Sequence, residues 1–214
     1  MYEDKISEQE RLYRLTEHER GMWARGIVHG GVDEVGRGPL AGPVVAACVA
    51  MPQEPLIEGI NDSKKLSPAR RERLDEAIRT ATVCFALGIA DIGEIDELNI
   101  RGATRLAMKR AVEGTAVEFV LTDAERDLDI RQPQLALIHG DAISYQIAAA
   151  SIVAKVHRDR MMEQYDLQYP QYGFARNKGY GTAEHMEALR KHGPCPIHRP
   201  LFLRKILGEG ASKG

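Results

Sequence analysis

The chain has 214 residues, of which 43% are hydrophobic and 28% charged, which is typical of one soluble globular domain with a small appendage and excludes a disordered chain. The longest apolar run, residues 44–51, is far too short to cross a membrane. The N-terminal segment lacks the apolar core of a signal peptide, and three widely spaced cysteines do not form a disulfide framework. We therefore expect a cytoplasmic protein with no membrane segment.

Charge is distributed unevenly along the chain. Residues 151–214 contain 11 Lys and Arg against 6 Asp and Glu, whereas residues 1–150 contain 18 against 25. An acidic first part and a basic last part are compatible with a metal-binding half joined to a phosphate-binding half.

The first elements expected along the chain are a helix and a hairpin. Residues 5–27 are predicted to form a charged peripheral helix, with a capping box at Ser7 and Glu10. Residues 30–35 and 44–51 have the length and β-branched content of strands. Because the turn between them is rich in Gly and Pro, the pair predicts a β-hairpin.

From Ser67 onward, predicted helices alternate with predicted strands. In chain order, these are a helix that begins at Ser67-Pro68, a strand at 83–90, a helix at 94–113, strands at 117–121 and 135–138, and a helix from Ile143. The segment after Pro170 is rich in Gly, Pro, aromatic and basic residues. A hairpin followed by this alternation predicts a mixed α/β sheet flanked by helices.

Four acids are candidates for a metal site. Asp33 and Glu34 lie in an apolar strand, where carboxylates are costly unless a partner such as Mg²⁺ or Mn²⁺ compensates their charge. Asp123 and Asp141 each end a predicted strand, where α/β sheets place ligands. For each acid alone, a solvated position, a turn or a helix cap is the alternative. Strand alternation separates Asp33 from Glu34, so Glu34 reaches the metal through a bulge, through its carbonyl, or not directly.

The turn Gly36-Arg37-Gly38 begins a G-x-G-x-x-A pattern, but a strand follows it where a dinucleotide-binding fingerprint requires a helix. We interpret it as a flexible turn whose backbone amides approach a ligand, with a plain hairpin turn as the alternative. Lys64 and Lys65 lie in a loop before a helix, where they either touch phosphates or are simply solvated.

Tyrosines gather near the C-terminus. Four of the seven, Tyr165, Tyr169, Tyr172 and Tyr180, lie close together among basic residues. This mixture is typical of stacking on sugars or bases and of pairing with phosphates. A small aromatic core is the alternative.

Long motifs carry a resemblance to a known family. In chain order they are GVDEVGRGPLAGPVV, NDSKKL, AAASIVAKVHRDR, YPQYGFARNKGYGT and HGPCPIHR, and they span residues 31 to about 202. Together these motifs resemble ribonuclease HII, the prokaryotic type 2 ribonuclease H. The resemblance implies a ribonuclease H-like mixed β-sheet flanked by helices, with a small helical C-terminal part.

The resemblance also implies roles for individual residues. Asp33, Glu34, Asp123 and Asp141 match the catalytic acids and metal ligands, which hold two divalent ions, Mg²⁺ or Mn²⁺, when substrate is bound. The substrate-binding residues implied are Gly36, Arg37 and Gly38, whose backbone senses the ribose 2′-hydroxyl, and Tyr180, which stacks on the adjoining deoxyribose. Lys64 and Lys65 are added as substrate-binding candidates because their ammonium groups can touch phosphates. Tyr172 is the alternative to Tyr180 for this stacking.

The implied activity is endonucleolytic hydrolysis of RNA in RNA–DNA hybrids and incision 5′ to single ribonucleotides in duplex DNA, leaving 3′-hydroxyl and 5′-phosphate ends. A DNA nuclease or resolvase and a non-catalytic nucleic-acid-binding module are the competing classes. We expect a monomer with an N-terminal helical extension (1–28), a catalytic domain (29–165) and a C-terminal aromatic and basic substrate-binding part (166–214). Leu201-Phe202 is expected to be a hydrophobic anchor, with binding to a replication clamp as the alternative.

Overall fold

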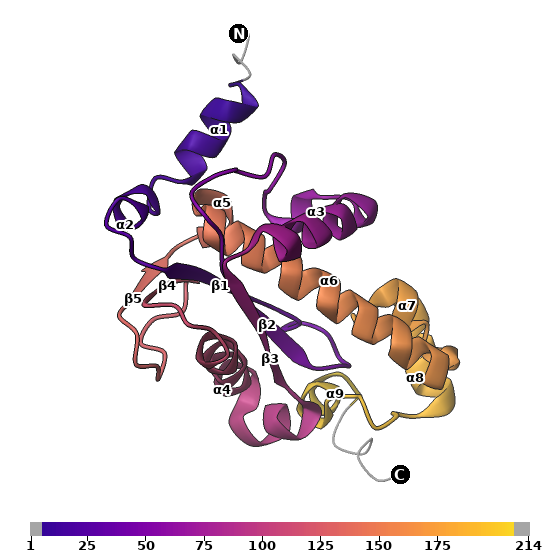
Figure 1. Cartoon of the computed structure of the whole chain (residues 1–214). Coiled ribbons are helices and arrows are strands. Elements are labelled where there is room, and N and C mark those ends of the chain that lie inside the picture. The colour runs from indigo at the N-terminus through magenta and orange to yellow at the C-terminus, as the bar shows by residue number, and fades with distance from the viewer. Residues whose placement is uncertain (1–5, 208–214) are drawn as a thin grey trace, which may run out of the picture.

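The structure is a computed structural model that describes residues 6–207 (Figure 1). Residues 1–5 and 208–214, the outer ends of the two terminal parts expected from the sequence, lie outside the described residues. The strands are β1 (His29–Val35), β2 (Val44–Ala50), β3 (Cys84–Ala90), β4 (Phe119–Asp123) and β5 (Gln134–Leu137). The helices are α1 (Glu8–Leu15), α2 (Arg20–Trp23), α3 (Pro68–Ala81), α4 (Ile92–Glu113), α5 (Gly140–Ile143), α6 (Tyr145–Gln168), α7 (Phe174–Asn177), α8 (Ala183–His192) and α9 (Pro200–Leu207), with 3₁₀ turns η1 (Ser63–Lys65) and η2 (Pro170–Tyr172).

The five strands form one mixed sheet in the order β3-β2-β1-β4-β5. The predicted hairpin is confirmed, because β1 pairs antiparallel with β2, and β2 pairs antiparallel with β3. On the other side, β4 pairs parallel with β1, and β5 pairs parallel with β4. Three adjacent strands therefore run in the same direction and end at the same edge of the sheet.

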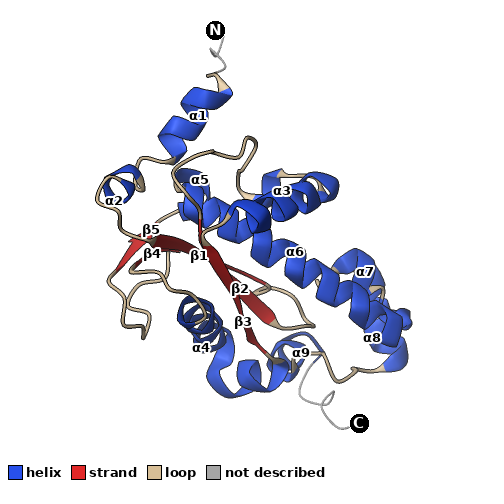
Figure 2. Ribbon diagram, viewed as in Figure 1, coloured by secondary structure: helices blue, strands red, loops and turns tan. Residues whose placement is uncertain are grey.

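Helices cover both faces of the sheet (Figure 2). Side chains of β2 alternate between the faces, so Ala47 and Val49 pack with α3 and α6, whereas Ala46 and Cys48 pack with α4. The predicted mixed sheet flanked by helices is confirmed. None of the helices over residues 6–207 combines the length and the apolarity that a membrane crossing requires.

Helix α6 packs against β1 at closest approach over Gly31. A Cβ atom at Gly31 would lie 2.2 Å from the backbone of Gln146 and Ile147, so only glycine allows this distance. The first turn of α6 is thereby held against the strand that carries Asp33.

The N-terminal segment forms two helices, so the prediction of one peripheral helix over 5–27 was wrong. Ser7 does cap α1, because its side chain accepts a hydrogen bond from the Glu10 amide. The chain then turns and buries Glu19, whose carboxylate accepts hydrogen bonds from Ser144 Oγ at 2.6 Å and from the Gln146 amide at 3.2 Å. This contact, formed across more than 120 residues, interrupts the helix because Glu19 must reach the first turn of α6.

Replacing Glu19 with glutamine is expected to stabilise the protein more at pH 8 than at pH 4. Burial raises the pKa of Glu19, and its Oε2 is buried without a hydrogen-bond partner among the described residues. A raised folded-state pKa means that stability is lost as the pH rises through that value, and glutamine removes this loss. We expect a gain of about 1 kcal/mol at pH 8. Thermal melts of both proteins across this pH range test it, with Glu17→Gln as the control at an exposed position; an equal gain at both pH values would contradict it.

Segments after α6 pack as a small helical part at the end of that helix (Figure 1). A separate apolar cluster holds Tyr172, Phe174 and Leu189 against Leu40 and Met162. Leu40 belongs to the loop after β1, so this cluster joins the C-terminal helices to the hairpin. All three cysteines are free, as expected.

Candidate active site

Three of the predicted acids meet at one edge of the sheet. Asp33 lies near the end of β1, Asp123 is the last residue of β4, and Asp141 lies in α5 just after β5. Their carboxylate oxygens can lie within 4.8 Å of one another. Parallel register explains the meeting, since Val32 of β1 pairs with Thr122 of β4 and the next residue on each strand is an aspartate. We call Asp33, Asp123 and Asp141 the acid cluster.

Backbone amides hold two of these carboxylates in place. Oδ1 of Asp123 accepts a hydrogen bond from the Gly140 amide at 2.8 Å, and Oδ1 of Asp33 accepts one from the Glu34 amide at 2.8 Å. His139, which precedes Gly140, adopts a left-handed backbone conformation with φ of 57°, so the chain turns sharply between β5 and Asp141. The bond to Gly140 joins the ends of β4 and β5 at this turn.

The surroundings of the cluster disfavour three bare carboxylates. Burial raises the pKa of Asp33 well above its usual range, and repulsion from Glu34 and Asp123 raises it further. Burial likewise raises the pKa of Asp123, with Asp141 adding repulsion and the Gly140 hydrogen bond opposing the shift. A cation placed among these oxygens would reverse the repulsion.

The donor set suits a hard divalent ion. It consists of carboxylate oxygens without sulfur or imidazole, which is the chemistry that Mg²⁺ and Mn²⁺ prefer. Two of the three acids, Asp33 and Asp141, are buried, and within residues 6–207 the cluster pairs with no guanidinium or ammonium group other than that of Lys64. The residues present therefore fit a divalent metal.

Glu34 lies beside the acid cluster but not in it. Its Oε1 atom is 3.2 Å from the Arg37 guanidinium, and its side chain is largely buried. Burial raises the pKa of Glu34 and the Arg37 charge opposes the shift. Strand alternation accounts for this position, because Asp33 and Glu34 point away from each other. A direct role of Glu34 in metal binding stays a prediction.

The two predicted lysines behave differently. Nζ of Lys64 lies 3.5 Å from Oδ2 of Asp141, on a side chain that remains 78% exposed. Desolvation acts to lower the pKa of Lys64, but the charges of Asp141 and Asp33 outweigh it and raise the pKa overall. Lys65 is exposed and forms no ion pair within residues 6–207. Only Lys64 is therefore placed at the acid cluster.

The glycine turn and Tyr180 lie together. Gly36 has φ of +96°, which favours glycine, and the turn then exposes Arg37 and Gly38. A Cβ atom on Gly38 would lie 3.5 Å from Cε1 of Tyr180, a residue that is 46% exposed. The Tyr180 ring thus lies next to the turn with much of its surface free.

Tyr172 has a different environment. It is 2% exposed, its hydroxyl donates to the Gly193 carbonyl at 2.7 Å, and its ring stacks on Phe174 at a centroid distance of 5.3 Å. The alternative of a small aromatic core is therefore confirmed for Tyr172, whereas stacking by Tyr180 stays a prediction. Tyr172 belongs to a small aromatic core, and Tyr180 has a surface that a ligand can reach.

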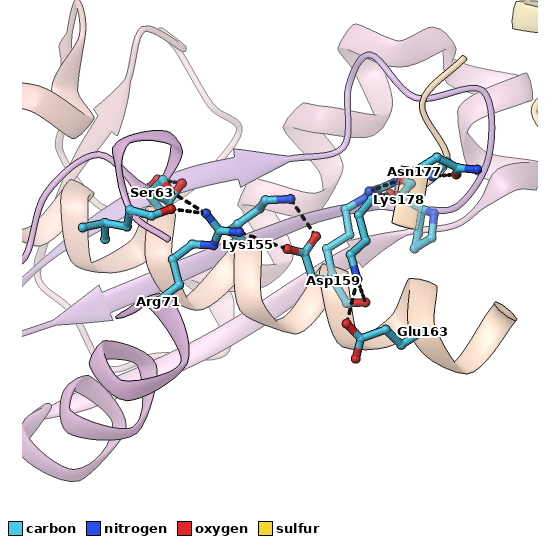
Figure 3. Close-up of polar contacts among 12 residues, drawn as sticks. Ser63, Arg71, Lys155, Asp159, Glu163, Asn177 and Lys178 are labelled. Atoms are coloured by element: carbon cyan, nitrogen blue, oxygen red, sulfur yellow. Dashed lines mark hydrogen bonds and ion pairs between the residues drawn. The ribbon is translucent and has the colours of Figure 1, made fainter. Parts of the chain in front are cut away.

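Sequence reasoning missed a polar network that ties the loop before α3 to α6 and to the segment after α7 (Figure 3). Arg71 donates to the Ser63 carbonyl at 3.1 Å and lies 3.7 Å from Oδ2 of Asp159. Lys155 donates to Oδ1 of Asp159 at 2.6 Å, and Lys178 lies 3.4 Å from the Asp159 carbonyl. The spacing of Lys155 and Asp159 on a helix was readable as an ion pair, but their partners in other segments were not.

Comparisons with known proteins agree with this arrangement. Residues 30–205 match the sequence model of the family described as Ribonuclease HII. A curated ribonuclease HII from Desulfitobacterium hafniense is 52% identical over 204 residues, covering 94% of this chain and 78% of the relative. The ribonuclease HII of Caldanaerobacter subterraneus subsp. tengcongensis is 51% identical over 203 residues, covering 94% of this chain and 84% of the relative.

Solved structures give the same result. The RNase HII of Archaeoglobus fulgidus, solved in a complex with PCNA, is 27% identical with a TM-score of 0.67, covering 77% of this chain and 88% of that one. The ribonuclease H2 of Pyrococcus horikoshii is 26% identical with a TM-score of 0.65, covering 81% of this chain and 92% of that one. The chain therefore belongs to the ribonuclease HII family and is a metal-dependent endonuclease of the ribonuclease H class that acts on RNA–DNA hybrids.

Proposed function

We propose that the protein hydrolyses the RNA strand of RNA–DNA hybrids and incises duplex DNA on the 5′ side of single embedded ribonucleotides, leaving 3′-hydroxyl and 5′-phosphate ends. The observation that carries the proposal is that Asp33 of the acid cluster lies on β1, the strand that leads into the exposed turn at Arg37 and Gly38. Asp33, which belongs to the group that would cut the phosphodiester, is therefore only a few residues from the turn that would bind the adjoining sugar.

Residues around the acid cluster would hold the scissile phosphate and the metal. Asp33, Asp123 and Asp141 supply oxygen ligands, and the exposed ammonium group of Lys64 supplies a positive charge at the phosphate. The chemistry that bound Mg²⁺ or Mn²⁺ ions supply in such a two-metal site is activation of the attacking water and stabilisation of the leaving 3′-oxygen. No protein nucleophile is required. Glu34 is a further candidate ligand for the metal, and Lys65 is a further candidate contact for the phosphate.

Recognition of the sugar would come from the turn and the tyrosine. Backbone amides of Gly36-Arg37-Gly38 can donate to the ribose 2′-oxygen, which DNA lacks. Tyr180 is 46% exposed, so its ring can stack on the next sugar, and a 2′-deoxy sugar lets the ring approach more closely because it lacks the 2′-hydroxyl. This pairing favours the junction from RNA to DNA. Residues 166–214 are thereby proposed as a substrate-binding part next to the catalytic domain (29–165).

One duplex with a single ribonucleotide tests the proposal. We expect incision on its 5′ side with Mg²⁺ or Mn²⁺, no incision with EDTA, and no incision of the matched all-DNA duplex. The readout is product length and end chemistry on a denaturing gel, after labelling either end. Equal cutting of both duplexes would favour a DNA nuclease, and binding without cutting under every metal would favour a non-catalytic module.

We propose that the protein acts as a monomer, because one chain supplies the acid cluster, the turn and Tyr180. Phe202 packs against apolar clusters of the fold, and the Arg199 guanidinium lies 5.3 Å from the centre of its ring. These contacts support the interpretation of Phe202 as a hydrophobic anchor. Its burial leaves less of the ring for a clamp such as the PCNA of the Archaeoglobus complex.

A further inference from the structure

A buried arginine, Arg199, binds the glycine turn on the side that faces the interior of the protein. Arg199 is 0% exposed, and its guanidinium donates to four backbone carbonyls of the loop after β1. Nη2 reaches the Gly36 carbonyl at 2.6 Å, Nη1 reaches the Arg37 and Pro39 carbonyls at 3.1 Å and 2.9 Å, and Nε reaches the Gly42 carbonyl at 2.8 Å. One side chain therefore binds four carbonyls that are spread along this loop.

The charge of Arg199 has no acidic partner among residues 6–207. Burial, together with the charge of the nearby Arg158, lowers its pKa to about 9. A buried cation without a counter-ion is costly, and among the described residues the carbonyl dipoles and the Phe202 ring compensate its charge. Such a cost points to a role other than stability for this arginine.

Peptide geometry connects these carbonyls to the outer surface of the turn. In a trans peptide, the carbonyl of one residue and the amide N–H of the next point in opposite directions. Because the Gly36 and Arg37 carbonyls point inward to Arg199, the amides of Arg37 and Gly38 point outward. Neither amide donates to an acceptor within the described part of the chain, and both residues are exposed. Successive free amides of this kind form a binding site for an oxygen.

We propose that Arg199 is a positioning residue that sets the direction of the Arg37 and Gly38 amides, and thereby the discrimination between ribose and deoxyribose. The inference deepens the proposed function and rests on it, since these amides matter only where a 2′-oxygen is recognised. Arg199 itself touches no substrate and acts through the turn.

Arg158 provides a matched control inside the same fold. It is also 0% exposed, and burial lowers its pKa to about 10. Its guanidinium donates to the carbonyls of Pro43 at 3.0 Å, Ala41 at 3.0 Å and Lys178 at 2.9 Å. None of these carbonyls is followed by the Arg37 or Gly38 amide. The Arg158 side chain also packs against Gly36, where a Cβ atom would lie 2.3 Å from its Nε. Replacement of Arg158 thus removes a comparable buried guanidinium at the same turn but leaves the hydrogen bonds to the Gly36 and Arg37 carbonyls in place.

The test compares Arg199→Lys with Arg158→Lys in binding assays with Ca²⁺ in place of Mg²⁺. The probes are a duplex with one ribonucleotide and the matched all-DNA duplex. We expect Arg199→Lys to lower the preference for the ribonucleotide at least about tenfold, with all-DNA binding unchanged. The compact ammonium group of lysine has three donors at one point and cannot span the four carbonyls that the guanidinium fork reaches. Arg158→Lys is expected to keep the preference, and melting curves verify that both variants fold.

The outcomes separate the two proposals. An unchanged preference in folded Arg199→Lys, or an equal loss in Arg158→Lys, overturns the role of Arg199 and leaves the proposed function standing. A wild-type protein with no preference overturns the proposed function and the inference with it.

If Arg199→Lys does not fold, hydrogen exchange at single amides of the wild-type protein decides. The Arg37 and Gly38 amides are expected to exchange rapidly in the free protein and to become protected only by the ribonucleotide duplex. Protection in the free protein would show that these amides point inward, which contradicts the inference.

Discussion

Replacing Asp33 with asparagine is expected to lower hydrolysis of RNA–DNA hybrids by at least about a thousandfold, because metal-assisted stabilisation of the transition state supplies several kcal/mol. Asp33 is the most buried member of the acid cluster, and asparagine keeps its shape while removing its charge. Hybrid binding without catalysis should be retained, since contacts to phosphates and sugars lie elsewhere. Initial rates with Mg²⁺ and hybrid binding with Ca²⁺ measure the two effects separately.

A second effect of the same substitution has the opposite sign. Because burial and neighbouring carboxylates raise the pKa of Asp33, its charge destabilises the metal-free fold, and asparagine should raise the melting temperature without divalent ions. Asp129→Asn is the control, since Asp129 is exposed and pairs only with Lys109. Wild-type turnover by the Asp33 variant would overturn its assignment as a metal ligand.

The sheet was largely predictable because its signals are local. Strand length and β-branched content gave both strands of the hairpin to within a residue or two. Helix α3 begins where Ser67 offers its side chain to the Arg70 amide. The helices at the N-terminus were not predictable in the same way, because the turn before Glu19 is set by Ser144 and Gln146, far along the chain.

The acids of the candidate site were predictable from the sequence, but the buried contacts that hold the neighbouring turn were not. Asp123 and Asp141 follow strands, so pairing of those strands was enough to bring them together with Asp33. The proposed role of Arg199 depends on backbone carbonyls about 160 residues earlier in the chain. Because every residue has a backbone carbonyl, the sequence does not indicate which of them a distant side chain binds. The sequence motif that contains Arg199 resembled the family, but a motif does not indicate which backbone groups the guanidinium binds.

The choice between the two tyrosines was open at the level of sequence, and their burial now separates their expected effects. Tyr172→Ala is expected to cost about 3–5 kcal/mol of unfolding free energy, because it removes a buried ring and its hydroxyl bond to Gly193. Tyr180→Ala should cost little, since Tyr180 is 46% exposed. Chemical denaturation of both variants measures this contrast.

Activity should respond in the reverse order. Tyr180→Ala is expected to lose the preference for an RNA-to-DNA junction over uniform RNA, whereas Tyr180→Phe keeps the ring and should keep the preference. The hydroxyl of Tyr180 forms no hydrogen bond among residues 6–207, so its removal disturbs nothing inside the fold. The measurement is the ratio of cleavage rates on the two substrates, at a temperature where every variant is folded. If folded Tyr172→Ala alone lost the preference, the stacking role would belong to Tyr172, and the free surface of Tyr180 would need another explanation.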